Sequence, residues 1–338
     1  MKKIRIAQIG MNRYSHAPEI FTTLRLYPEV FDLVGFSLVE DERETCADKL
    51  KYFKGYPELT LEEILSDPTI EAVAVETDEI HLIKYAQLAA DAGKHIHMEK
   101  PGSQNLAGFE RLIETMRRTK KVFHTGYMYR YNPFIAKAIE RAKAGEIGTV
   151  FSVEAHMSRF DTPACREWLE SFKGGMMFYL GCHLIDLVVQ IQGFPKKIIP
   201  LNKQTGIGNI HTEDFGFAIL EYENGISVVR VSSTEVEGFQ RRQLVICGSY
   251  GTLELRPLES PVFEEKCGRK YMLTTRQKES IWEKDCYGIT TENESEPFQR
   301  YENMLLFFAQ MVRGEKENPY TLDYELELFR VIMKCCGL

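Results

Sequence analysis

The chain has 338 residues, a formal net charge of −7, and hydrophobic residues at 44% of its positions. This length allows one large domain or two ordinary ones, and the apolar share is that of a globular protein with a core. The acidic balance argues against a nucleic-acid binder, which needs a basic face, and no run of about 18 apolar residues predicts a membrane span.

The first part of the chain alternates between strand patterns and helix patterns. Residues 3–10 alternate apolar with polar side chains and end at Gly10, which favours a first strand over a signal peptide. The later strand patterns lie at 31–39, 70–77, 95–101 and 122–128, and the helix patterns at 17–28, 41–53, 59–67, 81–94 and 106–120. This alternation predicts an α/β domain over residues 1–124 with a doubly wound parallel sheet.

The pattern changes after residue 124. Strand-like runs follow one another at 149–160, 213–233, 242–255 and 270–275, and helix-like runs lie at 132–148, 174–193, 300–314 and 324–337. Successive strands with helices around them predict an α+β domain over residues 125–338, built on a large, mainly antiparallel open sheet. The polar, acidic residues 276–298 are expected to form a long mobile loop.

Eight cysteines are present, and none of them forms a Cys-x-x-Cys pair. Their spacing suits no zinc site, so no metal is expected. In a chain of this length they are interpreted as reduced thiols, which places the protein in the cytoplasm.

The turn after the first strand stands where a nucleotide-binding enzyme keeps its glycine-rich phosphate loop. The three glycine positions of that loop are occupied by Gly10, Asn12 and Ser15. Gly10 can make the tight turn, Asn12 tolerates positive φ better than most residues, and Arg13 adds charge beside a helix N-terminus. From this loop alone, a dinucleotide site and an ordinary strand–helix turn both remain open.

The end of the second strand lacks the acid that usually binds the ribose hydroxyls of NAD. Leu38 occupies that place, and Glu40 and Asp41 follow it. Either one of these acids reaches back, or the ribose is held differently. An acid at this place would repel the 2′-phosphate of NADP. Because that acid is missing and Arg43 is near, both NAD and NADP remain open.

A lysine follows the fourth strand, in the sequence Glu99-Lys100-Pro101. The carboxyl ends of parallel strands face the ligand cleft in doubly wound folds. Pro101 restricts Lys100 to extended geometry, which fixes where the side chain starts. The alternative is a strand-end lysine that reaches solvent.

The apolar stretch at 174–193 carries three polar side chains. As a helix it is buried, and Tyr179, His183 and Asp186 fall at i, i+4 and i+7 on a single face. Gly181 inside a helix costs about 1 kcal/mol relative to alanine, which suggests close packing. The alternative is a core histidine held by Asp186.

Taken together, these motifs resemble the Gfo/Idh/MocA family, the relatives of glucose–fructose oxidoreductase and inositol dehydrogenase. The resemblance rests on the order and spacing of Glu-Lys-Pro at 99–101 and Leu-Gly-Cys-His-Leu-Ile-Asp at 180–186, about eighty residues later. It extends over nearly the whole chain through Thr77 and the stretches at 91–95, 126–133, 213–225 and 247–255.

The resemblance implies a Rossmann domain that binds NAD or NADP, a second domain whose open sheet often mediates oligomers, and an active site between them. The lysine matching Lys100 contacts substrate and nicotinamide ribose and transfers protons, in a Lys-Pro peptide that is often cis. The histidine matching His183 hydrogen-bonds or protonates the substrate oxygen. The expected cofactor-binding residues are Gly10, Met11, Asn12, Arg13, Leu38, Thr77, Glu99 and Lys100. The expected substrate residues are Tyr127, His156, Arg159 and Asp186.

One departure from the family concerns the chemistry. The family usually has an aspartate four residues before the histidine, and here that place holds Tyr179. A tyrosine can donate or accept a hydrogen bond, but with a reference pKa near ~10 it is a poor base at neutral pH. Because Tyr179 takes the place of that aspartate, it is counted with Lys100 and His183 among the expected catalytic residues.

Three functions follow as hypotheses. The first is an NAD(P)-dependent dehydrogenase or reductase acting on CH–OH groups of sugars, cyclitols or related polyols, as a homo-oligomer with no nucleic-acid or membrane partner. The second is a glycosidase of the same fold that uses bound NAD for a transient oxidation. The third is a non-catalytic sensor, against which the retention of both Lys100 and His183 argues.

Overall fold

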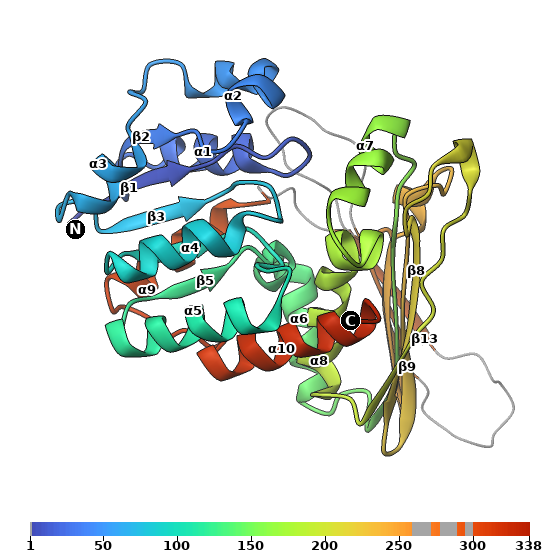
Figure 1. The fold of residues 1–338 in the computed structure, drawn as a ribbon. Coiled ribbons are helices and arrows are strands. Elements are labelled where there is room, and N and C mark those ends of the chain that lie inside the picture. Colours follow the sequence, from blue (N-terminus) through green and yellow to red (C-terminus); the bar gives the residue numbers. More distant parts are fainter. Residues whose placement is uncertain (1, 259–271, 278–288, 295–299) are drawn as a thin grey trace, which may run out of the picture. The chain divides into compact units, whose positions relative to one another are not determined.

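A computed structural model describes residues 2–258, 272–277, 289–294 and 300–338 (Figure 1). Two compact units are present: Met1–Tyr127 with Tyr301–Leu326, and Met128–Arg300 with Glu327–Leu338. The first division falls close to the predicted boundary after residue 124. The chain then returns to the first unit near its C-terminal end, which the sequence pattern did not predict.

The first unit contains a five-stranded parallel sheet in the order β2-β1-β3-β4-β5, which confirms the predicted doubly wound sheet. Its strands are β1 (Ile4–Ile9), β2 (Phe31–Ser37), β3 (Ala72–Val75), β4 (His95–Met98) and β5 (Phe123–Thr125). All four residues of β3 are buried, as expected for a central parallel strand. Strand order reverses between β1 and β3, so ligands are expected at the carboxyl ends of these two strands.

Helices cover both faces of this sheet (Figure 1). They are α1 (Ala17–Leu26), α2 (Glu42–Thr45), the 3₁₀ helix at Ala47–Phe53, α3 (Leu61–Ser66), α4 (Leu82–Asp91), α5 (Leu106–Thr119) and α9 (Glu302–Val312). On β5, Phe123 packs against Phe109 of α5, whereas the next residue, His124, stacks on Phe308 of α9. Because successive strand residues point to opposite faces, α5 and α9 cover opposite sides. The apolar α9 fills the second face, which is why the C-terminal segment belongs to this unit.

The second unit contains an eight-stranded sheet in the order β13-β12-β11-β10-β6-β9-β8-β7. Its strands are β6 (Val150–Ser158), β7 (Lys197–Pro200), β8 (Phe215–Tyr222), β9 (Gly225–Ser232), β10 (Gln243–Gly248), β11 (Gly251–Leu255), β12 (Met272–Gln277) and β13 (Ile289–Glu294). Within this sheet only the β6–β9 pairing is parallel among the described strands, so the predicted mainly antiparallel sheet is confirmed.

The prediction of a long mobile loop over residues 276–298 is wrong for part of that range. Residues 289–294 form β13, which pairs antiparallel with β12. Inter-strand hydrogen bonds stabilise these polar residues in an outer strand, whereas composition alone suggested a loop. Residues 278–288 and 295–298 lie outside the described residues.

The helices of the second unit are α6 (Pro133–Lys143), α7 (Pro163–Trp168), α8 (Cys182–Gln192) and the last part of α10 (Leu322–Cys335). The single helix predicted at 174–193 is a π-helical turn at Met177–Gly181 that continues as α8. A Cβ on Gly181 would lie 2.5 Å from Sδ of Met177, so the close packing predicted there occurs against the preceding turn. A π turn has more residues per turn than an α-helix, so it shifts Tyr179 relative to the face that α-helical spacing assigns to it.

Two further observations concern the described residues as a whole. No helix among them is long and apolar enough to cross a bilayer. Six cysteines are free thiols, and the other two, Cys267 and Cys286, lie outside the described residues.

Candidate active site

The turn after β1 is closed by Gly10. Its φ is +92°, and a Cβ at this position would lie 2.7 Å from the backbone nitrogen and from Cβ of Thr77. Any side chain would therefore displace the loop after β3, in addition to the strain of a positive φ. Gly10 thus brings the loops after β1 and β3 together at the point where strand order reverses.

Asn12 joins the two loops. Its Oδ1 accepts hydrogen bonds from the backbone N–H groups of Tyr14 (2.8 Å) and Ser15 (3.0 Å), and its Nδ2 donates to the Thr77 carbonyl (3.2 Å) and to Glu79 Oε2 (2.9 Å). Asn12 is fully buried, so these bonds fix its side chain. Two amides of the expected phosphate loop thus converge on one acceptor oxygen.

Arg13 places a cation at the same turn. Its guanidinium lies 3.6 Å from the Asp41 carboxylate and 3.7 Å from the Asp78 carboxylate, and the side chain is 37% exposed. The partial exposure leaves this charge accessible to an anion at the turn.

The acidic residues after β2 bind other parts of the first unit. Leu38 directly follows the strand, at the place expected for a ribose-binding acid. The Glu40 carboxylate accepts hydrogen bonds from Lys84 (2.6 Å) and Tyr85 (2.8 Å) of α4, so it is held by that helix.

Glu42 is a residue that the sequence patterns did not single out. Its carboxyl accepts hydrogen bonds from Val39 N (2.8 Å), Thr77 Oγ1 (2.6 Å) and the backbone of Met11. Burial raises the pKa of Glu42 to about 7, although these hydrogen bonds favour the charged form. It lies four positions beyond Leu38, and only the fold brings it to the loop after β1.

Lys100 follows β4 and is only 3% exposed, so the side chain is buried and does not reach solvent. Its Nζ lies 3.7 Å from Glu99 Oε1, and the same oxygen accepts a hydrogen bond from the Lys100 backbone N–H at 3.0 Å. The Lys100–Pro101 peptide is cis, as the family resemblance implied. A Cβ on Gly126 would lie 3.3 Å from Glu99 Cα, so the backbone of the next loop packs closely here.

Two more carboxyls, Glu76 and Glu79, lie in the loop after β3, and both are fully buried. Burial raises the pKa of Glu79 to about 8 and that of Glu76 well above its ordinary value, while Lys100 lowers both. Glu76 Oε1 lies 3.5 Å from Nε2 of His97, whose pKa burial lowers to about 3. Strongly shifted carboxyls beside a buried lysine are typical of functional sites.

In the second unit, the π turn places Tyr179 among aromatic and cationic side chains. The Tyr179 ring lies 5.1 Å from that of Trp168, edge to face, and the Arg159 guanidinium lies 5.7 Å from its centre. Arg159 is paired with Asp161 and donates to Cys165 Sγ at 3.3 Å. The structure therefore brings together Tyr179 and Arg159, which the sequence placed in separate segments.

His183 lies on α8 beside Tyr129, with ring centres 5.2 Å apart in an edge-to-face arrangement. One turn further, both oxygens of Asp186 accept hydrogen bonds from Arg130, at 3.0 and 2.9 Å, and Gln190 also donates to Asp186. The Asp186 and Arg130 side chains are each 1% exposed. Asp186 is thus the partner of a buried arginine, a contact that helical spacing did not predict.

Two predicted substrate residues remain, Tyr127 and His156. Tyr127 is buried at the end of the first unit. On β6, Val153, Ala155 and Met157 are buried, whereas His156 alternates with them on the other face of the sheet. The structure therefore does not place His156 on the sheet face that α8 covers.

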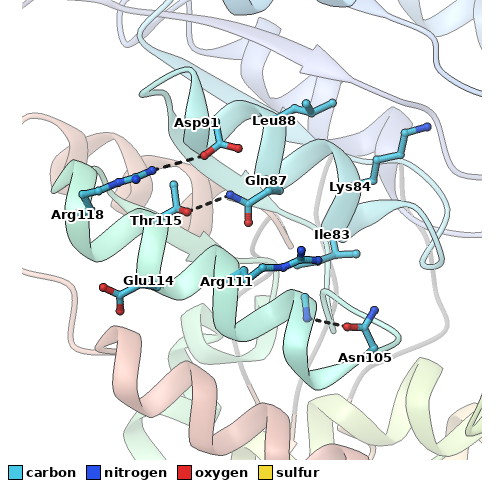
Figure 2. Close-up of a pocket in the computed structure, with 11 residues that line it drawn as sticks. Ile83, Lys84, Gln87, Leu88, Asp91, Asn105, Arg111, Glu114, Thr115 and Arg118 are labelled. Carbon is cyan, nitrogen blue, oxygen red and sulfur yellow. Dashed lines mark hydrogen bonds and ion pairs between the residues drawn. The ribbon is translucent and has the colours of Figure 1, made fainter.

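A groove of about 820 Å³ also lies on the first unit, between α4 and α5 (Figure 2). Its polar side chains largely pair with one another: Gln87 donates to Thr115 at 3.0 Å, and Arg118 lies 3.7 Å from Asp91. None of the expected catalytic residues lines it. The groove is therefore distinct from the candidate site at the strand ends.

The residues at the strand ends fit a dinucleotide. The amides of Tyr14 and Ser15 converge on an oxygen of Asn12, so the loop is arranged around an acceptor, as a phosphate oxygen would be. Helix α1 begins at Ala17 without a side-chain cap. Arg13 supplies a partly exposed cation beside these donors.

Comparison with known proteins agrees with this geometry. Residues 4–127 match a family model described as an oxidoreductase family with an NAD-binding Rossmann fold, and residues 135–254 match the GFO/IDH/MocA C-terminal domain. The chain belongs to the Gfo/Idh/MocA oxidoreductase family. Its cofactor class is therefore NAD(P), and the recognition made from the two sequence motifs is confirmed.

Named members of the family are distant relatives. The myo-inositol 2-dehydrogenase of Thermotoga maritima is 25% identical over 259 residues, which cover 74% of each chain. Among solved structures, a putative NADPH-dependent oxidoreductase of Desulfitobacterium hafniense has a TM-score of 0.80 at 19% identity, covering 100% of this chain and 95% of that chain. An aldose–aldose oxidoreductase of Caulobacter crescentus has a TM-score of 0.78 at 18% identity, covering 99% and 98%.

Proposed function

We propose that this protein is an NAD(P)-dependent dehydrogenase or reductase that acts on a carbinol or carbonyl carbon of a sugar, cyclitol or related polyol. The observation that carries this proposal is Lys100, a buried amine at the carboxyl end of β4 with carboxyls beside it. A relative named for the oxidation of inositol supports the substrate class.

A nicotinamide held by the turn after β1 would supply the two-electron acceptor for the hydride of the carbinol carbon. Lys100 takes the hydroxyl proton as the O–H electron pair becomes the carbonyl π bond. His183 holds the substrate oxygen by a hydrogen bond.

The roles of the other residues follow from their positions. The turn at Gly10, Met11, Asn12 and Arg13, together with Leu38, Thr77 and Glu99, holds the cofactor. In the second unit, Tyr179 donates a hydrogen bond to a substrate hydroxyl, and Arg159 beside it keeps that subsite polar. A phenol and a guanidinium suit a hydroxylated, uncharged or acidic substrate.

We also propose that copies of the chain associate through the open face of the eight-stranded sheet. Phe217, Ile219, Val228 and Val245 lie on this face, half-buried, and alternate with fully buried neighbours. Ile226 on the same face is 52% exposed. Sedimentation of the purified protein tests the association.

Free thiols at the six described cysteines support a reducing compartment, the cytoplasm.

Titration of the purified protein with NAD(H) and NADP(H), followed by nicotinamide fluorescence, tests cofactor binding. A screen of polyols and sugars then follows nicotinamide absorbance. Lys100→Met is expected to abolish turnover while the dinucleotide still binds. Lys94→Met is the matched control, because Lys94 is an equally buried lysine at the opposite end of β4 that bonds only carbonyls of Asp67 and Ile70 among the described residues.

The outcomes separate the hypotheses. Absorbance change with a polyol that requires Lys100 supports the proposal. Cleavage of a glycoside without net cofactor reduction would favour the glycosidase instead. Absence of dinucleotide binding would contradict both enzymes and favour a sensor.

A further inference from the structure

We propose that Glu42 is a positioning residue for the dinucleotide. Its carboxyl joins the loops that follow β1, β2 and β3, and two neighbouring side chains help it to hold the backbone of the turn at Met11 and Asn12. The turn, which keeps one of the three loop glycines, is thus fixed by side chains from the segment after β2. This inference rests on the proposed function, which assigns the turn to a dinucleotide.

The Glu42 carboxyl accepts a hydrogen bond from each of three loops. Its Oε2 accepts from Val39 N at 2.8 Å, its Oε1 accepts from Thr77 Oγ1 at 2.6 Å, and the Met11 backbone N–H donates to the same carboxyl. Glu42 is only 3% exposed, and Met11 and Thr77 are fully buried. Because the three donors follow three different strands, the carboxyl fixes the spacing of the loops at the point where strand order reverses.

Two further side chains of the same segment bond the turn. Cys46 Sγ donates to the Met11 carbonyl at 3.1 Å, and Lys49 Nζ donates to the Asn12 carbonyl at 2.8 Å. Glu42, Cys46 and Lys49 fall at i, i+4 and i+7 in the segment formed by α2 and the 3₁₀ helix after it, a spacing that places them on one face. This face therefore bonds both N–H and C=O groups of the turn backbone.

The other two acids after β2 have different partners. The Glu40 carboxylate is held by Lys84 and Tyr85 of α4. The Asp41 side chain is 63% exposed and lies 3.6 Å from the Arg13 guanidinium. Among the described residues, neither carboxylate accepts a hydrogen bond from the backbone of the turn. The positioning role therefore belongs to the third acid.

A turn that is fixed in advance favours binding, because it loses less conformational freedom when the dinucleotide binds. The Arg13 cation and the amides of Tyr14 and Ser15 directly follow the held backbone. Without the carboxyl, the Met11 amide and the Thr77 hydroxyl lose a buried acceptor, so the loops after β1 and β3 are no longer joined through it. Dinucleotide affinity is therefore expected to depend on position 42.

Hydrogen exchange of the protein without cofactor tests how the turn is held. In Glu42→Ala, peptides covering residues 9–16 should exchange at least tenfold faster than in the unmodified protein. Glu42→Gln should show a smaller increase, because its carbonyl can accept from Val39 N and its NH₂ group can donate to Thr77 Oγ1. Glu44→Ala removes an exposed glutamate of the same helix and is the matched control, for which no change is expected.

Dinucleotide affinity is the second measurement, with NADH and NADPH as probes and nicotinamide fluorescence as the signal. Glu42→Ala should raise Kd at least tenfold, since it removes several hydrogen bonds and one typically contributes about fivefold. Lys49→Met removes only the bond to the Asn12 carbonyl and should raise Kd about fivefold. Lys51→Met removes an equal charge from an exposed position of the same segment and serves as its control.

Unchanged exchange at residues 9–16, or an unchanged Kd, in Glu42→Ala would overturn the positioning role. So would an exchange increase that is equal in all peptides of the first unit, because it would reflect general destabilisation. Circular dichroism identifies a variant that does not fold. If Glu42→Ala is such a variant, Lys49→Met decides: unchanged exchange and Kd there would overturn the role.

The two proposals can fail separately. If the unmodified protein binds neither dinucleotide, the proposed function fails, and the exchange data still decide whether Glu42 holds the turn. With an active substrate, Glu42→Ala should raise the KM for the dinucleotide by a larger factor than it lowers kcat. If the protein oxidises a carbinol and the dinucleotide KM is the same in Glu42→Ala, only the role of Glu42 fails.

Discussion

Replacing Glu79 by glutamine is expected to stabilise the first unit, and to do so increasingly as the pH rises. The pKa of Glu79 is raised from 4.5 to about 8 by burial. In the unfolded chain the carboxyl ionises above pH 4.5, whereas in the folded protein it keeps its proton up to about pH 8. Stability is therefore complete below pH 4.5 and is lost progressively as the pH rises to 8. Glutamine does not titrate, so the variant keeps that stability.

The size of the effect follows from the same values. The two pKa values differ by about 3.5 pH units, and each unit corresponds to about 1.4 kcal/mol, so the loss at pH 8 is about 5 kcal/mol. Glutamine suits the site because its carbonyl can accept the Asn12 hydrogen bond at the position of Oε2. Its NH₂ group then replaces an oxygen that has no partner among the described residues.

Native-state hydrogen exchange, read by mass spectrometry on peptides from β1 and β3, measures this free energy in the first unit. Trp168 and Trp282 both fall within residues 128–300 of the second unit, so tryptophan fluorescence would follow the wrong part of the chain. Unfolding free energies are compared at pH 5 and pH 8, with exchange rates corrected for pH. A difference between variant and unmodified protein that is equal at the two pH values would refute a raised pKa at Glu79.

Three further predictions concern other contacts. Asn12→Ala should lower dinucleotide affinity about five- to tenfold by calorimetry, because the amides of Tyr14 and Ser15 lose the acceptor that orders the turn and one such hydrogen bond contributes about 1 kcal/mol; unchanged affinity would mean that Asn12 does not shape the cofactor site. Asp186→Ala should cost about 3–5 kcal/mol in urea denaturation followed by tryptophan fluorescence, because the buried Arg130 guanidinium loses both of its hydrogen bonds to that carboxylate; a loss below 1 kcal/mol would contradict this. Lys100→Met and His183→Asn should each lower kcat at least 100-fold and the double variant little further, whereas multiplying losses would show that the two act independently.

Much of the fold could be predicted from local sequence patterns. The parallel strands of the first unit and the strand-like runs at 149–160, 213–233 and 242–255 all appear as expected. These features depend on residues a few positions apart, so hydrophobic period and turn chemistry are enough to identify them. The position of Lys100 could be predicted for a related reason: in a parallel sheet, a residue after a buried strand must lie at the carboxyl edge.

The sequence by itself thus determined the two kinds of sheet, the turn at Gly10 and the lysine at the end of β4. The tertiary structure alone decided which carboxyls accompany that lysine, that Asp186 is paired with Arg130 across 56 residues of chain, and that α9 completes the first unit. The reason is physical: a raised pKa, a buried ion pair or a covered sheet face depends on neighbours that are distant in the chain. No local pattern of charge or hydrophobicity records which of those neighbours folding will bring into contact.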